Sequence, residues 1–297
     1  MKNVKYYMLL IIIMIIWGLN VPVLKILVDS LSPVTMTAFR ILIAGLTVFI
    51  ILSYLKLVRL PTKKEWMFIL FASLFNVVLH HFFLTIGLKG TNSTNAGLIL
   101  GSGPILTALI ATFLIGRKIS VWKWIGFVLG CIGVSLTILI GSKGVSGVSL
   151  GNILVFLSIL TQAFSFVLIS KAARTIDPRL LTGYMLVIGS SILIIIGFIL
   201  EPNGLSTFVK APTEVWLYFL SSAILATAVG HMTYNFIIGK IGPAEASVFL
   251  NLPPFITLIG SAMMLGETIT SLHIVGLFFI VTGVLLGSGA LEEIRKR

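Results

Sequence analysis

The chain has 297 residues, of which 58% are hydrophobic and only 10% are charged, against about 25% charged in soluble proteins. This composition excludes an ordinary soluble domain, and long apolar runs recur where about 20 residues would cross the hydrocarbon layer. The net charge of +12 does not indicate nucleic acid, because basic residues at helix ends are accounted for by membrane orientation. The single cysteine, Cys131, excludes an intrachain disulfide.

Ten apolar spans follow one another along the chain, and the connections between them leave no room for a soluble catalytic domain. The N-terminal span resembles a signal peptide, but it has no small-residue cleavage site and its apolar run continues past Trp17. We therefore interpret it as the first helix. The predicted spans are 6–24, 33–55, 65–88, 93–115 and 121–141, then 149–170, 178–200, 213–238, 243–265 and 272–289.

The second half of the chain repeats the first at a constant offset of 150 residues. Proline, glycine, histidine and tryptophan coincide in one register without a gap over about seventy residues, which indicates an internal duplication. We expect two five-helix repeats, 6–141 and 149–289. The pairs include Trp66 with Trp216, His81 with His231, Pro104 with Pro254, Thr107 with Thr257 and Gly126 with Gly276.

The basic residues predict the orientation of these spans. If the N-terminus is cytoplasmic, sixteen of the 21 lysines and arginines fall on the inner side and four on the outer side, as the positive-inside rule requires. Because each repeat has an odd number of spans, the second must be inverted relative to the first. The charges agree, since Arg117 falls inside and its counterpart Glu267 outside. Inverted repeats are typical of secondary transporters.

Three motifs and the duplication together resemble the EamA family of the drug/metabolite transporter superfamily. They are WGLN at 17–20, SPVTMTAFR at 32–40 and the P…LGE run at 254–267. The resemblance implies bacterial metabolite export through a central cavity lined by 65–115 and 213–265, with the fifth helix of each repeat packed away from it. One departure is Arg117, which stands where the family usually has a glutamate, so a role needing both acids is in doubt.

Prolines interrupt the fourth span of each repeat. Proline removes a backbone hydrogen bond and clashes with the carbonyl four residues earlier, so Pro104, Pro253 and Pro254 should break these helices. Freed backbone at membrane depth is tolerated only where it meets protein or a watery cavity. With Ser102 and Asn251 beside the breaks, we expect cavity-lining carbonyls and polar side chains. The alternative is a packing kink satisfied by neighbouring helices.

Polar side chains within other spans are the remaining candidates for substrate contact. Ionisable groups in spans are costly and indicate function, although interhelical hydrogen bonds worth about 0.6 kcal/mol are the structural alternative. Histidine titrates near physiological pH, which would allow proton coupling. The candidates are Trp17, Asn20, Asn76, His80, His81, Thr85, Gln162, Ser165, Thr227, His231, Tyr234 and Asn235.

Charged residues near span ends have simpler interpretations. Arg40 lies inside the second span near the outer face, and we favour outward snorkelling over contact with an anionic substrate group. Glu201 and Glu267 are expected to be outer-loop charges, and His273 is expected at the membrane interface.

The sequence therefore predicts an all-α polytopic membrane protein that acts as a secondary transporter, with efflux of amino acids or related metabolites implied by the resemblance. No Walker loop, paired carboxylates or metal-ligand spacing occurs, so we expect no cofactor, no metal and no enzymatic activity. The expected partners are a small substrate, the lipid bilayer and a coupling proton, in a monomer or homodimer. We expect the plasma membrane with both termini cytoplasmic. The alternatives are an importer, a channel and a membrane-embedded enzyme.

Overall fold

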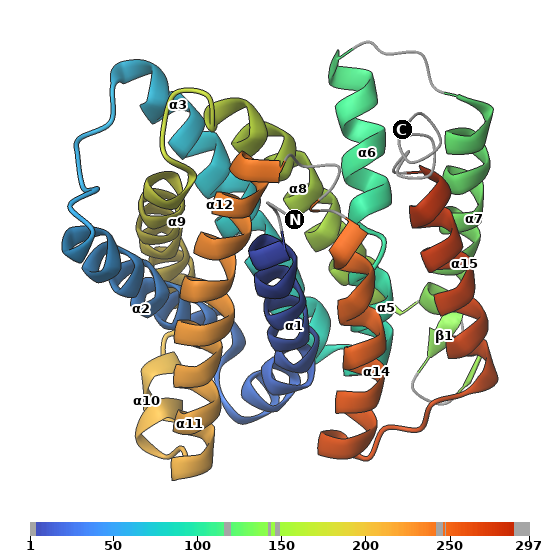
Figure 1. The fold of residues 1–297 in the computed structure, drawn as a ribbon. Helices are drawn as coiled ribbons and strands as arrows, with labels where there is room; N and C mark the ends of the chain where they lie inside the picture. The colour runs from blue at the N-terminus through green and yellow to red at the C-terminus, as the bar shows by residue number, and fades with distance from the viewer. Residues whose placement is uncertain are drawn as a thin grey trace.

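The computed structural model describes residues 4–115, 120–141, 144–145, 149–241, 246 and 248–287, which are almost entirely helical (Figure 1). The first half contributes α1 (Val4–Ser30), α2 (Pro33–Tyr54), α3 (Lys63–Ala72), η1 (Ser73–Leu79), α4 (His80–Lys89), α5 (Ser93–Leu100), α6 (Gly103–Ile115), α7 (Val121–Leu139), β1 (Ile140–Gly141) and β2 (Gly144–Val145). The second contributes α8 (Leu150–Ala172), α9 (Pro178–Leu200), α10 (Gly204–Val209), α11 (Thr213–Ser221), η2 (Ser222–Gly230), α12 (His231–Ile241), η3 (Val248–Asn251), α14 (Leu252–Leu265) and α15 (Ser271–Gly287).

The outside of the helical bundle is apolar. Within the described residues, seven continuous helical segments are long and apolar enough to cross a membrane, and three shorter apolar helices accompany them. Large hydrophobic side chains such as Ile50, Met263 and Phe278 are more than half exposed. A soluble monomer rarely exposes apolar surface on this scale, so the fold is that of a multi-pass helical membrane protein.

Two element boundaries differ from the sequence prediction. Helix α1 continues to Ser30 instead of ending at 24, and Lys25 and Asp29 form an ion pair of 3.2 Å at i,i+4 spacing on its last turns, which stabilises helix. The span predicted at 121–141 ends slightly earlier as a helix, because its last two residues form β1, which pairs antiparallel with β2.

Four of the helical segments are interrupted, at corresponding places in the two halves. The π-helical segments η1 and η2 separate α3 from α4 and α11 from α12. Helix α5 ends at Leu100, just before Pro104, whereas α14 is preceded by the 3-10 turn η3 and carries Pro253 and Pro254 in its first turn. Proline cannot donate to the helix ladder, and the predicted breaks are confirmed.

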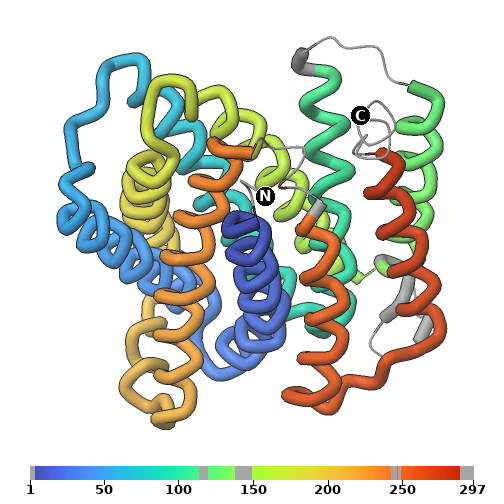
Figure 2. Tube along the Cα trace, viewed as in Figure 1, coloured from blue at the N-terminus to red at the C-terminus, as the bar shows by residue number. Residues whose placement is uncertain are grey.

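Glycines allow α7 and α15 to approach closely. A Cβ atom at Gly126 would meet the backbone of Gly283 and Gly287, and one at Gly133 would lie 2.8 Å from the carbonyl oxygen of Gly276. The two helices therefore run antiparallel and lie side by side, as the green and red tubes in Figure 2 show. Small residues permit such contacts in membranes, and here they pack two helices of one chain against each other.

Helix α1 lies in the middle of the bundle in Figure 1. It contacts helices from both halves of the chain, among them α2, α4, α14 and η2. It runs parallel to α14, because Gly18 lies against Ile256 and Pro22 lies against Gly260. The Thr257 hydroxyl donates a 2.8 Å hydrogen bond to the carbonyl oxygen of Gly18. This contact places the broken start of α14 beside the middle of α1, and residues of both line a cavity.

Candidate functional site

A cavity of about 120 Å³ lies among α1, α2, α4, α8, η2 and the two broken helices. It is several times the volume needed for one water molecule. Both halves of the chain contribute to its wall. The predicted residues that line it are Trp17, Asn20, His80, His81, Pro104, Gln162, Thr227, His231, Pro253 and Pro254.

The indole of Trp17 forms one wall and is held from η2. Its Nε1 donates a 2.9 Å hydrogen bond to the carbonyl oxygen of Ala226, which lies in the π-helical segment. The ring also packs against His231 and Tyr234, with centroids 5.1 Å away in each case. Gly230 is required here, because a Cβ atom would lie 2.5 Å from the indole nitrogen. Interruptions of this kind are frequent at functional sites.

His80 is fixed by two hydrogen bonds to α8. Its Nδ1 lies 3.0 Å from the carbonyl oxygen of Ser158, which can only accept, so Nδ1 carries the hydrogen. Nε2 then accepts from the amide of Gln162 at 3.0 Å in the neutral ring. Both His80 and Gln162 line the cavity, so the pair presents an oriented polar edge to it.

Arg40 points into the protein, and the snorkelling that the sequence favoured is wrong. Its side chain is 1% exposed, and its Nη1 donates to the hydroxyl of Thr227 at 2.6 Å and to that of Ser222 at 3.4 Å. Its Nη2 lies 3.4 Å from Nδ1 of His81. Because arginine only donates, that nitrogen accepts and the hydrogen of His81 is on Nε2. Arg40 lines the cavity.

Most of the other candidates from the sequence are buried. Three of them form hydrogen bonds between helices, and Ser102 bonds within its own turn. Most are paired by hydrogen bonds with other polar groups, which is the structural role weighed above. The bonds join Asn76 to Ser165 at 2.6 Å, Thr85 to Thr37 at 2.9 Å, Asn235 to Thr182 at 2.8 Å and Ser102 to the carbonyl of Ile99 at 2.7 Å. Tyr234 packs between Trp17 and Phe166, and Asn251 ends η3.

Sequence reasoning placed His273, Glu201 and Glu267 near the helix ends but did not identify their hydrogen-bond partners. His273 is buried, with its Nε2 3.0 Å from the side-chain oxygen of Asn95. Glu201 and Glu267 are not free loop charges, because each accepts hydrogen bonds from the first turn of a helix in the other half. For Arg40 the signal was present, since a lone basic residue within a span indicates function by default.

A membrane-spanning bundle with a central cavity lined by both halves of the chain is the arrangement found in many membrane transporters. The EamA-like transporter family model matches residues 4–139 and again 149–289. The chain belongs to this family, as its motifs suggested, and is a membrane transporter of the drug/metabolite transporter type. These findings point to a transporter and not to an enzyme.

Several relatives are similar over nearly the whole chain. The uncharacterized transporter YyaM of Bacillus subtilis (strain 168) is 28% identical, over 98% of this chain and 96% of its own. The uncharacterized transporter YvbV of the same organism is 29% identical, over 94% and 90%. The chloroplastic WAT1-related protein At3g02690 of Arabidopsis thaliana is 26% identical, over 91% and 66%.

The fold also occurs in a solved crystal structure of a protein that is 19% identical to this chain. The TM-score is 0.67, and the alignment covers 96% of this chain and 97% of the other. At that identity the similarity establishes the fold alone.

Proposed function

We propose that the protein is a secondary active transporter that exports small organic metabolites, such as amino acids, by alternating access to the central cavity. The observation that carries the proposal is the position of this cavity at the broken helices of both halves, where Pro104 and Pro254 occupy equivalent places. In inverted-repeat transporters the substrate site lies at such an interface, on discontinuous helices.

Two observations support an architecture of ten transmembrane helices in two inverted repeats. The family model matches the chain twice, over 4–139 and 149–289, close to the predicted repeats 6–141 and 149–289. In addition, the 150-residue offset relates α7 to α15, and these helices are antiparallel. A duplicated unit that inserts in opposite directions would produce this relation.

The proposed location is the plasma membrane, with both termini cytoplasmic. The distribution of basic residues supports this orientation, and the loops predicted to be cytoplasmic lie together. The side chain of Arg59, in the loop between α2 and α3, donates to the carbonyl oxygen of Thr175, in the loop between α8 and α9, at 3.4 Å. Impermeant labelling of cysteines placed at Arg174 and Lys210 should occur from opposite faces of the cell.

Flux through purified protein in liposomes tests the transport function. Vesicles would be loaded with radiolabelled amino acids, nucleosides or aromatic amines, and efflux measured with and without a pH gradient. We expect saturable efflux that His231→Ala slows, because His231 lines the cavity beside Trp17. The control is Phe278→Ala on the exposed apolar surface. His231→Ala protein that inserts normally and transports at the wild-type rate would contradict the role of this residue.

The flux rate separates a carrier from a channel, and its response to gradients separates efflux from uptake. A cycling carrier saturates and shows counterflow, whereas a channel passes substrate far faster and does not. Proton coupling would appear as accumulation against a concentration gradient when only a pH gradient is applied. Absence of flux for every compound in the panel, under both conditions, would count against the transport of small metabolites.

A further inference from the structure

The strongest unexplained feature of the cavity is the environment of Arg40. Its guanidinium is almost completely buried, at the end of α2's second turn, and faces the cavity beside His81 and Thr227. The groups that it contacts are hydroxyls and an imidazole nitrogen. None of them is an anion. Burying an arginine in a membrane protein without a counter-charge is costly.

The described acidic residues all lie elsewhere. Each is near the end of a helical segment, and nearly all are occupied by another charged or backbone group. Asp29 pairs with Lys25, Glu65 with Arg59 and Asp177 with Arg179, Glu201 binds the start of α2, Glu267 binds the start of α5, and Glu214 is exposed in the first turn of α11. In the described part of the chain, no carboxylate is hydrogen-bonded to Arg40.

Arg40 also retains unused hydrogen-bonding capacity. A guanidinium has five N–H donors in a planar fork that fits a carboxylate. Among the described residues, the Nε of Arg40 is buried without a hydrogen-bond partner, and so are Nε2 of His81 and Nδ1 of His231. Buried polar atoms are seldom left unpaired. Three such atoms on residues that line one cavity indicate that a polar ligand completes the site.

On the basis of the transport function proposed above, we propose that the substrate carries a single carboxylate group and that Arg40 binds it. One guanidinium surrounded by uncharged groups neutralises one negative charge, which favours a monocarboxylate over a phosphate ester. The rest of the wall is mainly apolar, with Trp17, Phe166, Leu24 and Leu84 among its members. These side chains accommodate an apolar or aromatic body of an amino acid or organic acid.

The competing explanation is that Arg40 only connects helices, since it joins α2 to η2 through Thr227. A connecting role would affect all substrates equally, whereas a binding role discriminates acids from their amides. The test therefore compares matched pairs of probes: L-phenylalanine with L-phenylalaninamide, L-leucine with L-leucinamide, and benzoate with benzamide. Ligand-induced thermal stabilisation of the purified full-length protein measures binding, and liposome flux measures transport.

We expect at least one acid to stabilise the wild type at millimolar concentration. Arg40→Gln should weaken acid binding about tenfold or more, since a hydrogen bond to a charged group is worth about 1.5–3 kcal/mol. It should change amide binding little. Arg40→Lys, which keeps the charge without the fork, should be intermediate. Thr227→Val removes the shorter of the two hydrogen bonds from Arg40 to η2 and keeps the guanidinium, so it should retain the preference for the acid.

Three results would overturn the carboxylate assignment. They are tighter binding of the amides, equal weakening of acids and amides in Arg40→Gln, and no stabilisation by any acid. If Arg40→Gln does not fold, Arg40→Lys takes its place in the test. The assignment then predicts that this variant prefers acids over amides less strongly than the wild type does. Flux of amides or amines without flux of acids would refute the assignment while leaving the transport function intact. Absence of any flux would refute the transport function instead.

Discussion

The two ends of the bundle are closed by different kinds of contact. One end, here named the α10 side, includes α10 and lies at the bottom of Figure 1. There the Glu267 carboxylate accepts hydrogen bonds of 2.8 Å from the backbone nitrogens of Ser93 and Thr94 at the start of α5, and both hydroxyls also donate to it. Glu201 accepts in the same way from Val34 and Thr35 at the start of α2.

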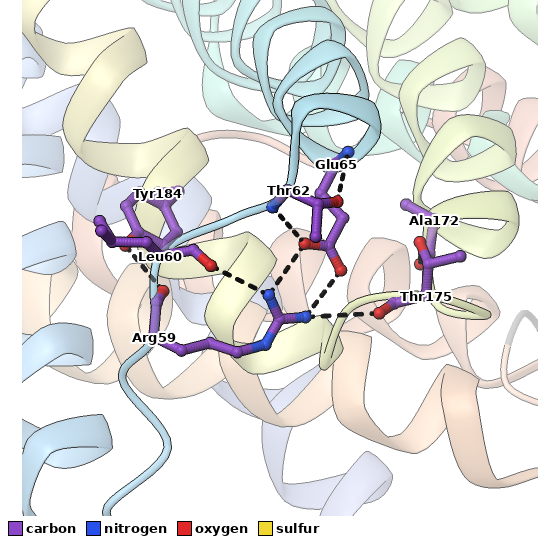
Figure 3. Close-up of polar contacts among 7 residues, drawn as sticks. All are labelled: Arg59, Leu60, Thr62, Glu65, Ala172, Thr175 and Tyr184. Carbon is purple, nitrogen blue, oxygen red and sulfur yellow. Dashed lines mark hydrogen bonds and ion pairs between the residues drawn. The ribbon is translucent and has the colours of Figure 1, made fainter.

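The opposite end, here named the α3 side, is closed mainly by bonds within one half of the chain (Figure 3). Arg59 binds both carboxylate oxygens of Glu65, at 2.6 and 2.9 Å. This hydrogen bond raises the pKa of Arg59 above its ordinary value. Glu65 also completes a capping box with Thr62. Among the described residues, the bonds that cross to the second half here go to uncharged groups, such as the one from Tyr184 to the carbonyl oxygen of Arg59.

This difference indicates which contacts must break when the halves separate. On the α10 side, Glu201 and Glu267 of the second half bind helix N-termini of the first, where the helix dipole adds to the attraction. Separation there would break charge-assisted hydrogen bonds. On the α3 side the ion pair stays within the first half and would move with it. We therefore expect carboxylate variants to favour opening only on the α10 side.

The largest effect is expected for Glu267→Gln, which replaces a carboxylate that accepts four hydrogen bonds. An amide has one acceptor oxygen and no charge, so much of the attraction to α5 is lost. The measurement is labelling by an impermeant maleimide of a cysteine at Leu24, a cavity residue, in a Cys131→Ser background. Labelling from the α10 side should become about tenfold faster.

The control for this experiment is Glu214→Gln, which removes an exposed carboxylate on the same side. It should leave the labelling rate unchanged. If both variants accelerate labelling equally, general loss of negative charge and not release of α5 explains the effect.

A smaller effect is expected for Glu201→Gln, because this carboxylate accepts three hydrogen bonds and not four. The same labelling should become a few times faster, in line with about 1 kcal/mol for loss of a helix cap. Combined with Glu267→Gln, the two effects should add in free energy, since the carboxylates bind different helices. Labelling of the double variant no faster than that of Glu267→Gln alone would show that α2 does not control access.

Gly204→Ala should also accelerate labelling at Leu24 from the α10 side, but less than Glu201→Gln does. A Cβ atom at Gly204 would lie 2.8 Å from Cβ of Thr35, whose hydroxyl and backbone nitrogen bind Glu201. The methyl group would displace Thr35 and lengthen these bonds. In the Glu201→Gln background the substitution should add little, because the bonds are already lost. An equal effect in both backgrounds would refute this explanation.

Two features of the site were predictable from the sequence: the helix breaks at the prolines and the pairing of His81 with His231. Pro104, Pro253 and Pro254 cannot donate to a helix wherever they stand, so the breaks followed from the sequence. The 150-residue offset paired His81 with His231, and the structure brings their rings to 6.2 Å. In the proposed architecture of two repeats, equivalent residues lie at equivalent depths, so this pair is expected to meet where the repeats adjoin.

The rest depended on contacts between distant segments. Whether Arg40 points to the membrane surface or inward is decided by Thr227, which is 187 residues away. Glu267 and Glu201 are loop charges by sequence, and the backbone nitrogens that they bind are 166 to 174 residues away. No local pattern encodes such partners, because any helix N-terminus attracts a carboxylate.

The smallest effect is expected on the α3 side, for Arg59→Lys. Lysine keeps the positive charge but cannot bind both oxygens of Glu65 at once, and Arg59 is about half exposed, at 45%. Glu65 is buried, but lysine keeps the charge pair and loses only its second hydrogen bond, so the melting temperature should fall only slightly. Labelling at Leu24 from the α10 side should stay at the wild-type rate. If Arg59→Lys instead accelerated that labelling as much as Glu267→Gln does, that result would show that the two ends are coupled. The ion pair would then have to move relative to the second half and not together with the first.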